Sequence, residues 1–365
     1  MTDVAIVGAG PVGLDLANRL VQSGVSVTVL EARERRGRHS RSIGIHAPSL
    51  ALLAETGVRD ALLERGLRIP RGRLFTPRGD AGTLDLAGAE PLAVPQYVTE
   101  EVLEAALPEG VVRRGVRVAG LSEEPSEAVL ATGTGPLPAR FVVAADGQDS
   151  TLRQALGIAF PGGPYSDTYA MGDFEDNTGL GHDAAICLTS EGLVESFPLP
   201  GGIRRWVVRT RAHAPDPDPE WVCAAVADRS GFRPDAATCS MVSGFRVHRH
   251  LAATMARGRV LLAGDAAHVV SPIGGQGMNV GWLDSRDAAG VLLEALGGAD
   301  HEPLFEAYSR RRRRTARQAA RRAAFNMAFG RPGMLAPLKR AAAGAMLRPP
   351  LAAWFVRQFT MGGLT

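Results

Sequence analysis

The sequence predicts an α/β protein in which a doubly wound nucleotide-binding domain with a parallel sheet carries an inserted antiparallel β-sheet and ends in helices. Three observations predict this: the chain opens with a strand, a glycine-rich turn and a helix; two β-rich segments interrupt the α/β pattern; and the residues beyond 281 are mostly helical in pattern. With 365 residues, 45% of them hydrophobic, the chain has room for two globular domains. Its net charge of +3 is too small to indicate nucleic acid as a partner.

The first element is a βαβ unit that begins with the short apolar strand "VAIV". Gly8, Gly10 and Gly13 follow with the spacing G-x-G-x-x-G: the first permits a tight turn, the second lets a pyrophosphate approach the backbone, and the third lets helix and strand pack closely. The helix N-terminus offers N–H groups to phosphates, and Glu31, which ends the second strand, can accept hydrogen bonds from ribose hydroxyls. This order of elements predicts a dinucleotide site.

The second signal is the stretch "FVVAADGQDSTLRQALG", in which a turn at Asp146 and Gly147 follows a buried strand. Ser150 or Thr151 can cap the helix that follows, and Arg153 lies early in that helix. Taken alone, this stretch indicates a turn and a capped helix more than it indicates a ligand site.

The third signal lies late in the chain, where Asp265 follows the apolar strand "RVLLAG" and can bind a ribose or ribityl hydroxyl. The next loop exposes backbone N–H groups at its glycines, Gly274, Gly275 and Gly277. A helix is expected to begin near Met278 and Asn279, and its N-terminus stabilises negative charge such as that of a reduced flavin ring. The two glycine loops therefore need not hold two ligands. They can bind the opposite ends of one long molecule, with adenosine diphosphate at the first loop and flavin at the last.

Three motifs, "GAGPVG", "AADGQDSTLR" and "LLAGDAAHVVSPIGGQGMN", together resemble those of the class A, single-component FAD-dependent aromatic hydroxylases of the para-hydroxybenzoate hydroxylase type. The stretch "GIHAPSLALL" is most similar to the branch that modifies antibiotics and polyketides. The resemblance covers nearly the whole chain and implies a doubly wound, Rossmann-like FAD-binding domain of the GR2 type plus a smaller antiparallel substrate sheet. The stretch "LDSRDAA" departs from the family's "DAxNLAW", which bears on the contacts of that helix.

The resemblance also implies roles for individual residues. The residues expected to hold FAD are Gly8, Gly10, Pro11, Val12, Gly13, Glu31, Ala32 and Arg33 at the adenosine end, Arg41 near the pyrophosphate, Gln96 along the ribityl chain, Asp146 and Gly147 in the motif shared by flavin and nicotinamide, and Gly264, Asp265, Pro272, Gly275, Gly277, Met278 and Asn279 toward the ring. No side-chain catalyst follows from the resemblance, and Pro272 and His46 are the candidates for lining the flavin. Supporting structural roles are favoured for His46 and His268 over contact with substrate.

The activity implied is that of an FAD-dependent monooxygenase. NAD(P)H reduces the flavin, O2 adds at flavin C4a, and the hydroperoxide hydroxylates an aromatic substrate, which is phenolic, polyketide-like or another secondary metabolite. A basic cluster could meet a 2′-phosphate and favour NADPH over NADH, although a solvated loop explains the cluster equally well: Arg33, Arg35, Arg36 and Arg38. The alternatives on this fold are an FAD-dependent reductase of isoprenoid double bonds, a Baeyer–Villiger or epoxidising monooxygenase, and a non-catalytic flavin protein. A halogenase would need a W-x-W-x-I-P motif, which the four tryptophans do not form.

The order of the segments predicts a discontinuous FAD-binding domain of residues 1–70, 96–164 and 245–300, a substrate-binding sheet domain of residues 71–95 and 165–244, and a C-terminal helical segment of residues 301–365. The basic run from Arg310 to Arg322 predicts a helix with a solvated face that packs on the flavin domain, with peripheral contact to an anionic membrane as the alternative.

No metal site is expected, because His248 and His250 alternate along a strand without a third ligand. Three widely spaced cysteines, no signal peptide and no long apolar run predict a cytoplasmic protein, and no pattern indicates an oligomeric state.

Overall fold

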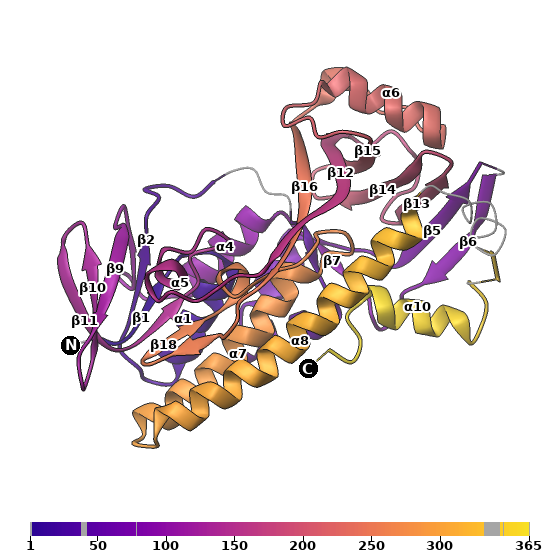
Figure 1. Ribbon diagram of the computed structural model, residues 1–365. Coiled ribbons are helices and arrows are strands. Elements are labelled where there is room, and N and C mark those ends of the chain that lie inside the picture. Colours follow the sequence, from indigo (N-terminus) through magenta and orange to yellow (C-terminus); the bar gives the residue numbers. More distant parts are fainter. Residues whose placement is uncertain (1, 38–41, 78, 332–343, 346, 365) are drawn as a thin grey trace.

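The computed structural model describes residues 2–37, 42–77, 79–331, 344–345 and 347–364. A mostly parallel sheet and a mostly antiparallel sheet lie toward opposite ends of the molecule, and two long helices run between them (Figure 1). The predicted α/β class is therefore confirmed.

No helix in the described part of the chain combines the length and the apolar character that a membrane span requires. The described residues also contain no group of three or more His, Cys, Asp or Glu side chains placed to hold a metal ion.

The parallel sheet is built on five strands in the order β18-β11-β1-β2-β8. Their bounds are β1 (Thr2–Val7), β2 (Val27–Glu31), β8 (Val112–Arg114), β11 (Gly135–Ala144) and β18 (Val260–Leu262). β1 lies at the centre and pairs in parallel with β2 on one side and β11 on the other. Its "VAIV" run is buried on both faces, as expected of a strand within a parallel sheet. Antiparallel additions are β9 (Val118–Glu123), β10 (Ala128–Thr132) and β17 (Ala256–Arg257).

Helices α1 (Pro11–Gln22) and α7 (Gln276–Leu296) pack against each other although they are far apart in sequence. The Trp282 indole Nε1 donates a hydrogen bond to the Pro11 carbonyl at 3.2 Å. One turn further along, the Ser285 hydroxyl donates to the buried Asp15 carboxylate. Ser285 belongs to the stretch that departs from the family pattern, so this departure supplies the buried Asp15 carboxylate with a hydrogen-bond partner in addition to Arg19.

The second sheet has the strand order β19-β16-β12-β15-β14-β13-β5-β6 and is antiparallel except where β13 meets β5. The strands are β5 (Arg71–Thr76), β6 (Gly79–Asp85), β12 (Gly162–Glu175), β13 (Ala184–Thr189), β14 (Gly192–Leu199), β15 (Ile203–Thr210), β16 (Met241–Leu251) and β19 (His268–Val269). Strands β5 and β6, from the first β-rich segment, thus join the strands of the later β-rich segment in a single sheet. His248 and His250 lie on β16, on a strand as predicted. The domain division drawn from the sequence remains a prediction.

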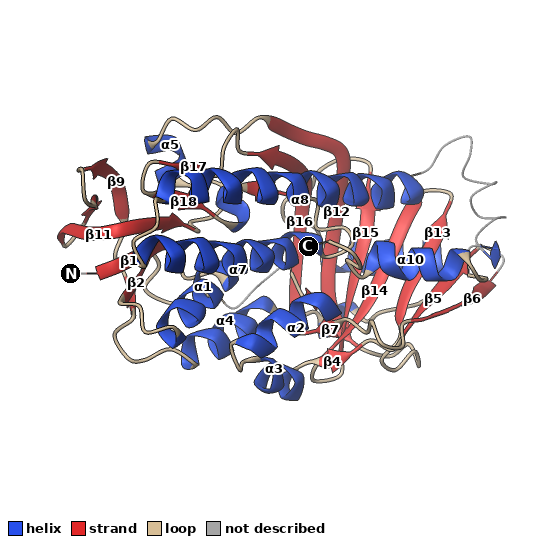
Figure 2. Cartoon of the chain, turned by 90° about the horizontal axis from the view of Figure 1, so that it is seen from below, coloured by secondary structure: helices blue, strands red, loops and turns tan. Residues whose placement is uncertain are grey.

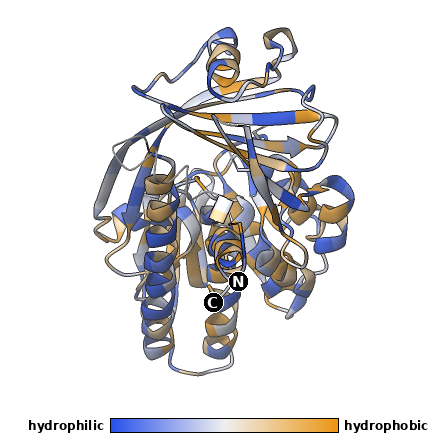
Figure 3. Cartoon of the chain, turned by 90° about the vertical axis from the view of Figure 1, so that its right-hand side faces the viewer, coloured by the Kyte–Doolittle hydropathy of each residue, from blue (hydrophilic) through white to orange (hydrophobic). Residues whose placement is uncertain are grey.

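One helix of this region was not foreseen. The sequence predicts a β-sheet domain over residues 165–244, but within that range α6 (Pro219–Ser230) lies over the outer face of the sheet (Figure 3). The Asp218 carboxylate caps it by accepting from the Glu220 N–H at 3.0 Å, Pro219 occupies its first turn, and Gly231 ends it in a left-handed conformation. These start and stop residues can be recognised in the sequence, because Asp218, Pro219 and Gly231 are residue types typical of helix ends.

The remaining elements connect the two sheets. They are a three-stranded sheet of β3 (Gly44–Ile45), β7 (Leu92–Ala93) and β4 (Leu67–Arg68), and the helices α2 (Ala47–Glu55), α3 (Arg59–Arg65), α4 (Gln96–Ala105), α5 (Thr151–Ala155), α8 (His301–Gly330) and α10 (Leu351–Phe359). Figure 2 shows α8 beside α7, running from the parallel sheet to the antiparallel sheet. The predicted helical character of the C-terminal segment is confirmed over its described residues.

The basic run on α8 is only partly solvated. Arg310 has an exposed side chain, whereas Arg312 is 1% exposed and points into the protein. The Arg312 Nε lies 2.8 Å from Asp284 Oδ1 on α7, and His268 Nε2 lies 2.5 Å from the other oxygen of the same carboxylate. All three side chains are buried. The run therefore contributes a buried ionic cluster that fastens α8 to α7.

The charge state of this cluster follows from its partners. Burial alone would raise the pKa of Asp284, but the adjacent His268 and Arg312 outweigh burial and lower the pKa of this carboxyl. Burial would likewise lower the pKa of His268, and the Asp284 carboxylate outweighs it and raises the pKa of the imidazole. His268 therefore has the structural role that was predicted for it.

We expect Arg312→Met to lower the free energy of unfolding by about 3–5 kcal/mol, because it leaves a buried carboxylate without its guanidinium partner. The matched change Arg310→Met should cost less than about 1 kcal/mol, because the Arg310 side chain and its partner Glu306 are exposed. Urea unfolding followed by circular dichroism measures both. Equal losses for the two variants would contradict the assignment.

Candidate functional site

Three loops meet at one edge of the parallel sheet because they follow the carboxyl ends of the neighbouring strands β1, β11 and β18. The first and second loops touch, since a Cβ added at Gly8 would lie 2.3 Å from the Ala145 carbonyl oxygen. The first and third also touch, since a Cβ added at Gly264 would lie 3.0 Å from Val12. The three motifs recognised in the sequence therefore form one site.

A single cavity of about 860 Å³ extends from this edge of the parallel sheet to the inner face of the antiparallel sheet. The predicted residues that line it are Gly8, Gly10, Pro11, Val12, Glu31, Ala32, Arg33, His46, Gln96, Asp146, Gly147, Gly264, Asp265, Pro272, Gly275, Gly277 and Met278. Gly13 and Asn279 do not line the cavity. Each instead contacts a glycine that does, since Gly13 packs against Gly8 and Asn279 donates a hydrogen bond to the Gly275 carbonyl. Arg41 lies outside the described residues. Both glycine loops thus face the same cavity, as one long ligand would require.

The first loop leaves open space where a phosphate could lie. Gly10 is the N-cap of α1 in an extended conformation, no side chain caps the helix, and an added Cβ at Gly10 would meet no atom within 4 Å. Gly13 is different, since its added Cβ would lie 2.1 Å from the Gly8 carbonyl oxygen. The predicted division of labour between the glycines, open approach at one and tight packing at the other, matches this geometry.

Glu31 is held rigidly at the end of β2. Its carboxylate accepts hydrogen bonds from the Ala9 N–H at 3.0 Å and from the backbone and side chain of Arg33 at 2.9 and 3.0 Å. Burial would raise the pKa of Glu31, but these hydrogen bonds outweigh it and lower the pKa, so the group is ionised at neutral pH. Two side chains of the predicted basic cluster form ion pairs within the protein, which leaves them less available to a 2′-phosphate: Arg33 binds Glu31, and Arg36 binds Glu104.

The second loop is fastened to the third by Arg153. The Ser150 hydroxyl accepts from the Arg153 N–H at 3.0 Å, which confirms Ser150 as the helix cap. The Arg153 guanidinium donates to the carbonyls of Ala266 and Gln148 and lies 3.8 Å from the centre of the Phe160 ring. Asp146 accepts from the Leu152 N–H at 3.3 Å, and its buried Oδ1 atom has no hydrogen-bond partner among the described residues. Burial raises the pKa of Asp146.

The third loop presents a carboxylate and a second uncapped helix to the cavity. The Asp265 side chain is exposed at the cavity wall, and desolvation by the surrounding protein raises its pKa. The chain then turns through Gly274 and Gly275, both with positive φ, and α7 begins at Gln276 without a side-chain cap. The helix starts two residues before the predicted position. Its first N–H groups and its dipole are available to negative charge.

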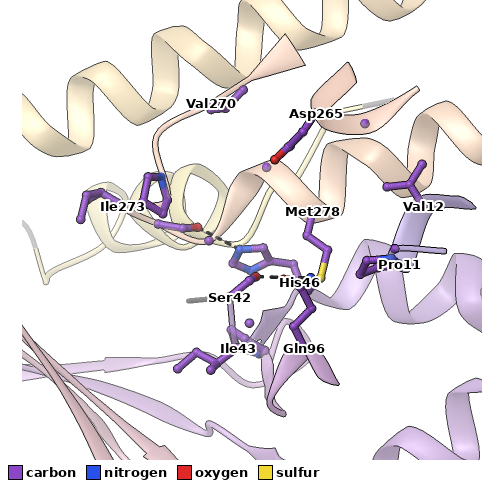
Figure 4. A pocket seen from close by; sticks show the side chains of 18 of the residues that line it. Pro11, Val12, Ser42, Ile43, His46, Gln96, Asp265, Val270, Ile273 and Met278 are labelled. Atoms are coloured by element: carbon purple, nitrogen blue, oxygen red, sulfur yellow. Dashed lines mark hydrogen bonds between the residues drawn. The ribbon is translucent and has the colours of Figure 1, made fainter. Parts of the chain in front are cut away.

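His46, which is labelled in Figure 4, and Asn279 fasten this loop to the N-terminal half of the chain through hydrogen bonds. The Asn279 amide accepts from the His46 N–H at 2.9 Å and donates to the carbonyls of Gly44 and Gly275 at 2.9 and 2.7 Å. The His46 imidazole Nε2 donates to the Gly274 carbonyl at 3.0 Å. Burial lowers the pKa of His46 to about 4, so the ring is neutral at pH 7. His46 therefore supports the loop as well as lining the cavity.

The far wall of the cavity comes from residues that carried no sequence motif. They lie on the inner face of the antiparallel sheet and are mostly apolar: Met171, Ile186, Leu193, Glu195, Val207 and Phe245. Period-two alternation along these strands separates inward from outward residues, but which face borders a cavity depends on sheet packing. Phe355 and Phe359 of α10 add to the wall.

These features fit a dinucleotide cofactor with a flavin ring. The space above Gly10 suits a pyrophosphate, and the carboxylates of Glu31 and Asp265 suit sugar and ribityl hydroxyls. The unpartnered oxygen of Asp146 lacks only a donor, and the two uncapped helix N-termini suit negative charge at two places along one molecule, its pyrophosphate and its ring.

A family model described as an FAD binding domain matches residues 1–323 of the chain. The chain is 33% identical over 320 residues to a rifampicin monooxygenase from Streptomyces venezuelae, covering 84% of this chain and 67% of that protein. It is 32% identical over 327 residues to a 6-methylpretetramide 4-monooxygenase from Streptomyces rimosus, covering 85% of this chain and 58% of that one. The chain thus spans 58% and 67% of the lengths of these two curated relatives.

Solved structures agree over the whole fold. A p-nitrophenol 4-monooxygenase from Pseudomonas putida superposes with a TM-score of 0.87 and 25% identity, covering 100% of this chain and 99% of that one. An aromatic hydroxylase from angucycline biosynthesis superposes with a TM-score of 0.82 and 30% identity, covering 100% of this chain and 76% of that one.

Separate substitutions of Gly10 and Gly13 should distinguish an effect on FAD binding from an effect on folding. We expect Gly10→Ala to weaken FAD binding about tenfold, or about 1.4 kcal/mol, while the apoprotein loses less than about 1 kcal/mol of stability, because the new methyl group enters open space. Gly13→Ala should destabilise the fold by about 1–3 kcal/mol through its clash with the Gly8 carbonyl. Flavin fluorescence titration and thermal unfolding of the apoproteins test the pair, and the reverse pattern would contradict this geometry.

His46 should make stability depend on pH. Its folded-state pKa lies below the ordinary value, so the unfolded chain binds a proton first and stability is lost as pH falls from 6.5 to about 4. The loss attributable to this group is about 3 kcal/mol. His46→Gln should therefore flatten the stability profile in this window relative to the wild type, whereas His182→Gln, at an exposed position, should not. Urea unfolding at pH 7 and at pH 4 gives the comparison.

Proposed function

The chain belongs to the FAD binding domain family, and from this premise we propose that it is a monooxygenase that uses FAD, NAD(P)H and O2 to hydroxylate an aromatic substrate. The substrate we propose is phenolic and polyketide-like or another secondary metabolite, in keeping with relatives named for rifampicin and 6-methylpretetramide. One observation carries the proposal: a single cavity joins three loops suited to FAD with an apolar wall suited to an aromatic molecule.

When bound, FAD supplies a ring that NAD(P)H can reduce and that activates O2. The chain positions this ring. We assign the pyrophosphate to the α1 N-terminus at Gly10, the ribose to Glu31, the ribityl chain to Asp265 and Gln96, and the ring to Pro272 and the loop after it. His46 and Asn279 hold that loop in place through their hydrogen bonds. The N-terminus of α7 would stabilise negative charge on the bound ring.

The apolar wall would exclude water from the bound ring and the substrate, which favours oxygen transfer over loss of the oxidant to side reactions. Met171, Val207 and Phe245 supply this wall from three strands of one sheet. Because the relatives compared above are named as monooxygenases and hydroxylases, hydroxylation is favoured over reduction of isoprenoid double bonds.

The nicotinamide and the setting of the enzyme also belong to the proposal. NADPH is favoured by the basic loop, although Arg33 and Arg36 already bind acids. The three cysteines are free thiols, which suits the reducing cytoplasm. We place the enzyme there, with small aromatic molecules and O2 as its partners.

The purified protein should be yellow and retain FAD, and phenols should accelerate its consumption of NAD(P)H. The product should be one oxygen atom heavier than the substrate, and the added atom should be labelled when the reaction runs under 18O2. Mass spectrometry of products from a panel of phenols tests this. An atom labelled from water, or turnover that consumes no O2, would exclude the hydroxylase function.

A further inference from the structure

The cavity wall formed by the antiparallel sheet contains one carboxyl group amid apolar side chains. On β14, Leu193, Glu195 and Phe197 face the cavity in alternation, while Val194 packs into the outer layer under α6. Glu195 lies opposite Ile186 on β13 and opposite Val207 on β15. The carboxyl group thus sits between two branched apolar neighbours, at the centre of the face that borders the proposed substrate space.

The charged groups on the neighbouring strand β15 are already engaged with other residues. On β15, Arg205 makes two hydrogen bonds of 2.7 Å to Asp173. Further along the same strand, Arg209 binds Asp167 at 3.0 Å, and Arg331 binds the other oxygen of Asp167. In the part of the chain that the structure describes, the Glu195 side chain makes no hydrogen bond and no ion pair, although it is only 6% exposed.

One further titratable group faces Glu195 from β12. Tyr169 is buried, and its burial together with the negative charges of Asp167 and Glu195 raises the pKa of the phenol, so it stays neutral. For Glu195 itself, burial raises the pKa to about 7. A buried carboxyl group without a partner costs stability, and such groups occur where function needs them. What Glu195 lacks is a hydrogen-bond donor, and the cavity is the place from which one can come.

We propose that Glu195 binds the hydroxyl group of a phenolic substrate and accepts its proton. This assignment rests on the proposed hydroxylase function. The substrate O–H bond breaks, a new O–H bond forms on a Glu195 oxygen, and the electron pair stays on the phenolate oxygen, so no oxidant or reductant is involved. The phenolate donates electron density into its ring, which makes the ortho and para carbons better acceptors of an electrophilic oxygen atom.

The assignment also defines the class of substrate. A phenol can satisfy Glu195, whereas its methyl ether has no proton to donate and leaves the carboxyl group unpaired. An aryl carboxylate would bring a second negative charge to the same buried place, with Arg205 and Arg209 already bound to aspartates. The cavity is therefore built for neutral hydroxylated aromatics and against aromatic acids.

Binding to the FAD-loaded protein gives the first test, with three probes of one shape: 1-naphthol, 1-methoxynaphthalene and 1-naphthoate. Equilibrium dialysis at pH 8 should show the wild type binding the phenol at least tenfold more tightly than the ether or the acid. Glu195→Gln should lose that preference and keep its affinity for the ether. Glu175→Gln, the same change at an exposed position of the same sheet, should behave like the wild type.

The pH profile gives the second test. For wild type, kcat/KM for phenol-stimulated NADPH oxidation should rise through about pH 7 as Glu195 ionises. Glu195→Gln should lack this rise and Glu195→Asp should retain it, which also covers the case in which one of the variants folds poorly. Flavin absorbance confirms that each variant carries FAD.

The outcomes separate this assignment from the hydroxylase function. If 1-naphthol binds in a Glu195-dependent way but stimulates no NADPH oxidation, the hydroxylase function fails and the phenol site stands. If the wild type and Glu195→Gln oxidise NADPH with the same pH profile, the function stands and Glu195 has no part in it. Equal affinity of the wild type for phenol and ether, or binding of neither, overturns the assignment of Glu195.

Discussion

The parallel pairing of β1 with β11, and of β11 with β18, is the constraint on which the site depends. The loops that follow these strands come from the beginning, the middle and the last third of the chain. Parallel strands place their carboxyl ends at one edge, so the loops must converge there. The contact is close enough that Gly8 tolerates no Cβ against the Ala145 carbonyl. A cavity that spans both glycine loops follows from this pairing.

Side-chain hydrogen bonds then hold together the three loops that the strand pairing places side by side. Arg153 joins the second loop to the third through carbonyls at 2.9 and 3.0 Å, and Asn279 joins the third loop to the segment before α2. Further along α7, Asp284 binds both His268 and Arg312 and so anchors α8. Because α8 reaches the antiparallel sheet, this buried cluster also fixes the far wall of the cavity relative to the cofactor loops.

The polar groups of the cavity fall into two kinds, and the difference is chemical. Glu31 accepts several hydrogen bonds from the protein, which keep it ionised and rigid. The half-buried Asp146 has one buried oxygen without a partner among the described residues, and the buried Glu195 makes no hydrogen bond with them; burial raises the pKa of each. Groups of the second kind gain stability only when a ligand supplies the missing donor. These two unsatisfied acceptors lie where cofactor and substrate are proposed to bind.

Much of the fold and of the cofactor side was determined by the sequence itself, because backbone geometry there demands particular residues. Only glycine suits the turn at Gly8 and the packing at Gly13, and Ser150 caps α5 through its own local chemistry. Tertiary structure alone decided that Arg33 would bind Glu31, that Arg312 would turn inward while Arg310 stays in solvent, and that Glu195 would border the cavity. Those outcomes depend on which face of a strand or helix meets its neighbour. Residues remote in sequence set that contact, and no local pattern records it.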